Sequence, residues 1–232
     1  MSYNLGFISD YDLIEHVRET YLNYASSIDE AKFYRNKVDP VKLTFDSFVY
    51  GRSYDEVITA ETNRQLDKTN TNLIGYFHQN IFKYISGWNV PLHGFDVESD
   101  DGVVVVEMKN KHNTMNSSSQ RATYEKMQRH LNNHPNSICM LVEVIARQSQ
   151  DIPWEYSGYS YNNIRRVSID RFYQIVTGDP NAFYNLCQVL PSALELVAAQ
   201  EGNVHIKNSV LDGGCGNLNG LFKSTFNDYL GF

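Results

Sequence analysis

Two acids and a lysine in the middle of the chain have a spacing that could support catalysis. Ten residues separate Asp96 from Glu107, and Lys109 follows two residues after Glu107. The four valines at 103–106 predict a strand that ends in Glu107 and Lys109, and alternation along a strand places these two side chains on one face. The turn signal Asp-Asp-Gly at 100–102 predicts a hairpin that brings Asp96 beside them.

Two carboxylates and an ammonium group in one place suit metal-assisted hydrolysis of a phosphodiester. Carboxylate oxygens are hard ligands for Mg²⁺, which neutralises a phosphate and lowers the pKa of a bound water. The ammonium group of Lys109 can position that water. The alternative is a cross-strand salt bridge beside a core strand, because an acid, a gap and Glu-x-Lys form a loose pattern.

The elements around this trio predict an α/β fold. Apolar residues at helical spacing alternate along the chain with short β-branched and aromatic runs. The order of helix, hairpin, helix, strand, strand and helix predicts a mixed β-sheet flanked by helices. The predicted helices cover about 12–24, 55–86, 117–131 and 180–200, and the predicted strands lie near 88–91, 94–98, 103–109, 138–146 and 164–169.

Length and composition restrict the class of protein. A chain of 232 residues without a linker-like segment predicts a single domain over 1–232, with a helical N-terminal part over about 1–55. The 20 basic and 27 acidic residues give a net charge of −7, so any DNA contact must come from a local basic site. Three scattered cysteines and the lack of a signal sequence or a long apolar segment predict a cytoplasmic protein.

The motif around the acids resembles a known group of enzymes. Phe95-Asp96-Val97, followed by Val105 to Lys109, resembles the metal-binding signature of the D…(D/E)xK nuclease superfamily, although Phe95 replaces the usual proline. The flanking segments resemble the type II restriction endonucleases that cut GGNCC or GGWCC. They are residues 75–82, 87–91, 107–118, 141–146 and 153–154. This resemblance covers about 60–190 and implies a restriction-endonuclease-like catalytic core there.

The resemblance also implies roles for individual residues. Asp96 and Glu107 would be ligands of Mg²⁺, and Lys109 would act on the attacking water. Superfamily members often add a carboxylate or amide from the helix before the hairpin, and the sequence leaves three candidates open: Glu61, Gln65 and Gln79. Gln120 and Tyr124 resemble the Gln-x-x-x-Tyr element of RecB-like nucleases.

Polar and basic residues after the predicted active strand are candidates for DNA contacts. The loop donors are Lys111, His112, Asn113, Thr114 and Asn116, and the candidate guanine readers are Arg147, Arg165, Arg166 and Arg171. Guanine offers two acceptors to an arginine in the major groove. The alternatives are a solvated loop and surface salt bridges. Alternation along a strand predicts that only one of Arg165 and Arg166 can face the DNA.

These observations favour a Mg²⁺-dependent type II restriction endonuclease acting on double-stranded DNA. Cutting both strands of a near-palindromic site predicts a homodimer, and the family implies a DNA methyltransferase as functional partner. The negative charge predicts weak binding to random DNA, which a site-specific enzyme tolerates. The alternatives are a structure-specific repair nuclease of the same fold and a non-catalytic DNA-binding protein.

Overall fold

A computed structural model describes residues 2–202 and 218–232. The chain forms two compact units, one of Met1–Tyr21 with Phe77–Phe232 and one of Leu22–Tyr76. The larger unit contains the β-sheet. Cys139 and Cys187 are buried free thiols, and Cys215 lies outside the described residues.

The sheet of the larger unit has six strands in the order β1-β2-β3-β4-β6-β5. Their bounds are β1 (Trp88–Asn89), β2 (Val97–Ser99), β3 (Val104–Lys111), β4 (Ile138–Ile145), β5 (Asp151–Pro153) and β6 (Ile164–Ser168). Strands β1, β2 and β3 are antiparallel, β3, β4 and β6 are parallel, and β5 is antiparallel to β6. The predicted hairpin and the predicted mixed sheet are both confirmed.

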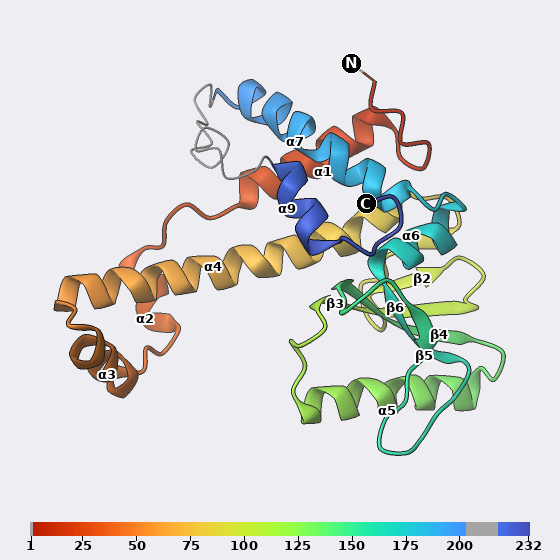
Figure 1. Cartoon of the computed structure of the whole chain (residues 1–232), viewed down its shortest axis with the longest axis horizontal. Helices are drawn as coiled ribbons and strands as arrows, with labels where there is room; N and C mark the ends of the chain where they lie inside the picture. Colours follow the sequence, from red (N-terminus) through yellow and green to blue (C-terminus); the bar gives the residue numbers. More distant parts are fainter. Residues whose placement is uncertain (1, 203–217) are drawn as a thin grey trace. The chain divides into compact units, whose positions relative to one another are not determined.

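Helices cover both faces of this sheet. Helix α5 (Ser117–Asn133) connects β3 to β4 and lies along one face, while α6 (Ile169–Thr177) and α7 (Ala182–Gln200) lie on the other side (Figure 1). The remaining elements of the larger unit are α1 (Asp10–Asn23), which runs two residues past the unit boundary, the 3₁₀ helix η1 (Ile81–Tyr84) and α9 (Leu218–Thr225). A parallel pair of strands needs such a crossover helix, so α5 follows from the pairing of β3 with β4.

Alternation along β3 separates two apolar clusters. Val105 packs in the cluster that includes Tyr124 and Met127 of α5, and Val106 packs in the larger cluster that includes Phe172 of α6. Both valines are almost fully buried. Since side chains two residues apart share a face, the α5 face of the sheet also receives the acidic end of β3.

Helix α7 is long and apolar enough to cross a membrane by its length and composition alone. Several of its side chains are buried in the larger apolar cluster, among them Phe183, Leu186 and Val197. Packing against the sheet explains the apolar composition of this helix. The helix continues through Pro191, and it ends at Gln200 as predicted.

The smaller unit is helical. It contains α2 (Glu30–Arg35), α3 (Pro40–Tyr50) and most of α4 (Tyr54–Asn80), whose last residues belong to the larger unit. The predicted helix over 55–86 is therefore α4 followed by η1. Asp39 caps α3 by accepting hydrogen bonds from the backbone N–H groups of Val41 and Lys42.

Helix α3 carries apolar side chains that the smaller unit does not cover. In the described part of the chain, none of its residues is buried. Seven apolar side chains of this unit, called the α3 face below, are 62–85% exposed: Tyr34, Val41, Phe45, Phe48, Val49, Tyr50 and Tyr54. A groove of about 680 Å³ lies beside them, lined by Tyr34, Phe48 and Tyr54 among others.

Candidate active site

Asp96 is fixed at the start of the hairpin by two contacts with β3. Its backbone N–H donates to the carbonyl oxygen of Val106 at 2.8 Å. Its carboxylate oxygen Oδ2 accepts a hydrogen bond from the backbone N–H of Met108 at 2.7 Å. These bonds hold the carboxyl group of Asp96 beside the end of β3, as the hairpin prediction required.

Glu107 and Lys109 lie two residues apart on β3 and share the α5 face. Glu107 is 8% exposed, and its Oε2 atom lies 3.5 Å from the Nζ atom of Lys109. Met108 between them points into the apolar cluster on the opposite face. The structure therefore brings together Asp96, Glu107 and Lys109, which we call the active-site trio.

The two carboxylates repel one another in a partly dry environment. Burial is the main cause that raises the pKa of Asp96, and the negative charge of Glu107 raises it further. The hydrogen bond from Met108 and the positive charges of Lys109 and Lys126 act in the opposite direction. A raised carboxyl pKa means that a second negative charge is unfavourable here, which is the electrostatic condition of a cation site.

A second lysine, which the sequence analysis did not single out, reaches the trio from α5. The Nζ atom of Lys126 forms an ion pair with the Oε1 atom of Glu107. It also donates to the carbonyl oxygen of Gly94 at 2.7 Å and lies 4.3 Å from the ring centroid of Phe95. No signal in the sequence distinguishes Lys126 from Arg121 and Arg129 on the same helix.

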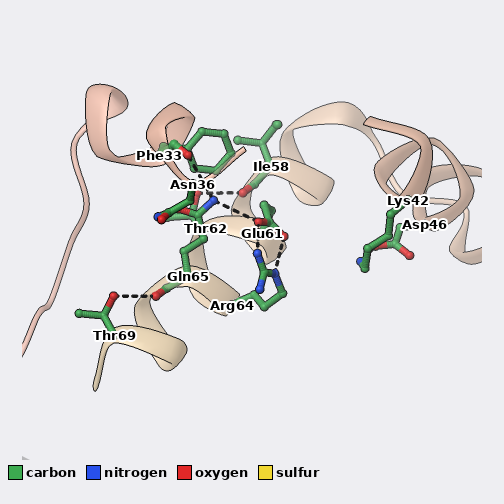
Figure 2. Close-up of polar contacts among 10 residues, drawn as sticks. All are labelled: Phe33, Asn36, Lys42, Asp46, Ile58, Glu61, Thr62, Arg64, Gln65 and Thr69. Carbon is green, nitrogen blue, oxygen red and sulfur yellow. Dashed lines mark hydrogen bonds and ion pairs between the residues drawn. The ribbon is translucent and has the colours of Figure 1, made fainter. Parts of the chain in front are cut away.

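One of the three supporting candidates on the preceding helix lies at the trio. Gln79 donates from its Nε2 atom to the carbonyl oxygen of Asp96 at 3.1 Å. Glu61 and Gln65 belong to the smaller unit, where they contact neighbours on α2 and α4 (Figure 2). The structure thus selects Gln79 as the amide beside Asp96.

Glu61 and Gln65 form a polar cluster inside the smaller unit (Figure 2). Glu61 accepts from the Nε atom of Arg64 at 2.7 Å and from the amide of Gln65 at 3.1 Å. Gln65 in turn accepts from the amide of Asn36 at 2.7 Å. The pKa of Glu61 is lowered, chiefly by the hydrogen bonds from Arg64. These contacts join α2 to α4.

Gln120 and Tyr124 serve the packing of α5 in this structure. The amide of Gln120 donates to the carbonyl oxygen of Met115 at 3.2 Å, which closes the loop before the helix. Tyr124 is buried against Trp154, and its hydroxyl donates to the carbonyl oxygen of Tyr159 at 3.1 Å. The side chain that α5 supplies to Glu107 is Lys126.

Both arginines of β6 are paired with carboxylates. Arg166 donates through Nε and Nη2 to the two oxygens of Glu143, at 2.9 and 2.5 Å, and Glu143 is fully buried. Arg165 donates through Nε to Asp151 at 2.6 Å. Glu143 lies opposite Lys109 in the register of β3 and β4. The pair of Arg166 and Glu143 therefore lies beside the trio on the α5 face of the sheet.

In the polar segment from the last residue of β3 to the start of α5, the side chains of Asn116 and His112 form hydrogen bonds with the backbone. Asn116 caps α5 by accepting from the backbone N–H of Ser119 at 2.8 Å. The Nδ1 atom of His112 lies 3.2 Å from the carbonyl oxygen of Ile145. Lys111 and Asn113 are exposed. Arg147, which follows β4, is exposed as well.

The donor set of the trio fits a magnesium ion. Within the described residues there is no group of three or more His, Cys, Asp or Glu side chains that could hold a metal. Mg²⁺ keeps several waters and is commonly bound through one or two carboxylates together with substrate phosphates. The two carboxylates of Asp96 and Glu107 meet that requirement.

The fold and the trio together define an α/β enzyme with the groups needed for phosphodiester hydrolysis. Comparison with known proteins then identifies the family, because the Eco47II restriction endonuclease family matches residues 5–198. The chain belongs to this family and is a type II site-specific deoxyribonuclease. The resemblance inferred from the motifs is confirmed, and the family match extends beyond the segment 60–190.

Two curated relatives cover most of the chain. The type II restriction enzyme Sau96I of Staphylococcus aureus is 35% identical over 208 residues, which are 82% of this chain and 80% of that protein. The type II restriction enzyme Eco47II of Escherichia coli is 28% identical over 214 residues, which are 84% of this chain and 89% of that protein. Restriction enzymes act on double-stranded DNA, so double-stranded DNA is the substrate.

We predict that Arg166→Ala destabilises the protein more than Arg165→Ala does. Loss of Arg166 leaves the buried carboxylate of Glu143 without its cation, which costs at least about 2 kcal/mol in the free energy of unfolding. Arg165 pairs with a partly exposed aspartate, so its loss costs about 1 kcal/mol or less. Urea denaturation of both variants measures the difference. Equal losses would show that Arg166 does not serve the fold in this way.

We predict that Asp96→Asn stabilises the metal-free protein at neutral pH. Because the pKa of Asp96 is raised in the folded state, the stability that this carboxyl group contributes is lost as the pH rises through its folded pKa. An amide removes the charge and can still accept from Met108. Thermal unfolding in EDTA at pH 7 should give a Tm higher by a few degrees, since 1 kcal/mol corresponds to about 2–4 °C in a chain of this size. A lower Tm would contradict the unfavourable ionisation of Asp96, which burial causes first and the charge of Glu107 increases.

Proposed function

We propose that Asp96 and Glu107 bind Mg²⁺ and that Lys109 acts on the attacking water in the hydrolysis of a DNA phosphodiester. The observation that carries this proposal is the convergence of the trio at the end of β3, with Oε2 of Glu107 3.5 Å from Nζ of Lys109. A bound magnesium ion supplies neutralisation of the phosphate and a water of lowered pKa. The backbone N–H of Met108 fixes the orientation of Asp96.

Lys109 provides a positive charge that does not depend on the metal. Its ammonium group can orient a water for attack and stabilise the negative charge that develops on the phosphate. The buried valines before Glu107 support the trio on a rigid strand, which keeps the reacting groups in place. Gln79 supports the backbone of Asp96 through the bond described above.

The recognition sequence that we propose is GGNCC or a related site. This proposal rests on the motif resemblance. Among the candidate DNA contacts, Lys111, Asn113 and Arg147 are exposed and can reach a DNA ligand directly. His112 and Asn116 have structural bonds, and Arg165 and Arg166 have carboxylate partners, so base reading by these four side chains stays a prediction. Base reading by Arg166 would require it to leave Glu143.

We propose that the active form is a homodimer located in the cytoplasm, with a DNA methyltransferase as its functional partner. Cleavage of both strands of a two-fold symmetric site calls for two equivalent active sites. We also propose that residues 1–232 form a single domain. Helix α4 supports this, because its residues belong to both compact units without a break in the helix.

The α3 face supports a second copy of this chain as the partner. Five of its seven exposed apolar side chains are aromatic, and aromatic side chains dominate the energetics of protein interfaces. The protruding Phe48 lies beside the apolar groove, so the same surface offers a projection and a recess, as a two-fold interface requires. Lys42 pairs with Asp46 on α3, while Lys37 lines the groove and the guanidinium group of Arg52 lies 5.1 Å from the ring centroid of Tyr50. The proposal of a second copy therefore rests on the exposed apolar side chains.

We predict that Glu107→Gln abolishes cleavage and that Lys109→Ala slows the chemical step by orders of magnitude. The amide keeps the shape of Glu107 and removes the charge that holds a hard cation. Unmethylated phage DNA is digested with Mg²⁺, and the fragment ends are sequenced to give the recognition site. Single-turnover rates separate chemistry from binding.

Glu98→Gln is the matched control for the cleavage assay, because Glu98 lies on β2 of the same hairpin and opposite Val105. This variant should cut at the parental rate. Cleavage by Glu107→Gln near that rate would refute the assignment. An unchanged single-turnover rate in Lys109→Ala with weaker DNA binding would make Lys109 a phosphate contact.

We predict that Phe48→Glu converts the dimer to a monomer. A buried charge in the centre of an apolar interface costs several kcal/mol unless it is paired. Sedimentation velocity of the full chain without metal measures the oligomeric state independently of cleavage. Tyr11→Glu on α1 adds the same charge at a side chain that is 74% exposed and lies in the larger unit, and it should leave the dimer intact. A monomeric wild type, or a dimeric Phe48→Glu, would exclude the α3 face.

A further inference from the structure

Lys126 makes more contacts with the active site than a surface lysine ordinarily makes. Its ammonium group pairs with Oε1 of Glu107, donates to the carbonyl oxygen of Gly94 at 2.7 Å, and lies over the ring of Phe95 at 4.3 Å from the centroid. Glu107 and Phe95 are both at least nine-tenths buried. Three independent partners therefore fix one cation next to a buried carboxylate.

The two oxygens of Glu107 each have a lysine as neighbour. Lys109 lies 3.5 Å from Oε2 on the same strand, and Lys126 contacts Oε1 from α5. A metal ion at either oxygen of Glu107 meets an ammonium group nearby, and the repulsion between the two positive charges opposes metal binding while that ammonium group stays in place. Lys126 contacts Oε1 directly, whereas the Nζ atom of Lys109 lies 3.5 Å from Oε2, so Lys126 is the ammonium group held more directly on the carboxylate.

We propose that Lys126 is a positioning residue that occupies the metal-ligand oxygen of Glu107 in the metal-free enzyme and competes with the divalent cation for it. The proposal rests on the assignment of Glu107 as a metal ligand. In the absence of metal, the ammonium group offsets the repulsion between Glu107 and Asp96. When a divalent ion binds, Lys126 has to give up Oε1, while Gly94 and Phe95 remain as its partners at the edge of the site.

Competition makes a prediction that a merely structural ion pair does not make. Removal of the Lys126 charge should weaken the metal-free fold, because Glu107 loses a charged hydrogen bond, and it should strengthen metal binding for the same reason. An activating or metal-binding lysine would give the opposite change in affinity. The two readouts, stability without metal and affinity for metal, must therefore change in opposite directions.

The test compares Lys126→Met, Lys126→Gln and Lys126→Arg with the wild type. Mn²⁺ binding is measured by electron paramagnetic resonance of the free ion, and the Tm is measured in EDTA. The methionine and glutamine variants should bind Mn²⁺ roughly tenfold tighter or more, the factor that corresponds to the loss of a hydrogen bond between charged groups, and should melt at a lower temperature. The arginine variant keeps the charge and should resemble the wild type.

Arg121→Gln is the matched control. Arg121 lies on the same helix, is largely exposed and pairs with Glu125, so its removal changes the net charge by the same amount without touching Glu107. Its Mn²⁺ affinity should stay within about twofold of the wild type, because exposed charges are screened by solvent and salt. If Arg121→Gln gained as much Mn²⁺ affinity as the Lys126 variants, the gain would come from the change in net charge alone. That result would overturn the proposal.

The outcomes separate this proposal from the one on which it rests. If the wild type binds Mn²⁺, Glu107→Gln does not, and Lys126→Met binds no tighter than the wild type, the metal site stands and the competition by Lys126 is wrong. If neither the wild type nor the Lys126 variants bind Mn²⁺, both proposals fall. If Lys126→Met fails to fold, the glutamine variant decides by the same two readouts.

Discussion

The arrangement of this enzyme depends on the confinement of two carboxylates at the end of an apolar strand. Asp96 and Glu107 lie where β3 leaves the core, so water screens their repulsion poorly. Positive charge at this position offsets the repulsion between the two acids. Lysines at 109 and 126 provide positive charge from the chain itself, and the donor set is suited to an ion of higher charge.

The rest of the sheet keeps this unfavourable site in place. Parallel pairing with β4 puts Glu143 opposite Lys109, and Arg166 of β6 closes on Glu143 from the next strand. Lys109 on β3, Glu143 on β4 and Arg166 on β6 thus form a row on the α5 face in which positive and negative charges alternate. Large apolar clusters on both faces supply the stability that such a row of partly buried charges does not provide.

The smaller unit differs from the larger one in what it buries. Its polar cluster around Glu61 and Gln65 joins α2 to α4, whereas the aromatic side chains of α3 stay on the surface. This small helical unit buries polar side chains and exposes apolar ones. Exposed apolar surface of this kind is typical of a binding site for another protein. A second copy of this chain is the partner that we propose for this surface.

The sequence by itself determined the α/β class, the hairpin and the trio, because these follow from strand alternation and from contacts close along the chain. It also carried the family resemblance. The tertiary structure decided which distant side chains complete the site. Lys126 and Gln79 reach it from helices 19 residues after Glu107 and 17 residues before Asp96, and the pairing of Arg166 with Glu143 depends on strand order. Their positions depend on how α4, α5 and β6 pack against β3, which local spacing does not specify.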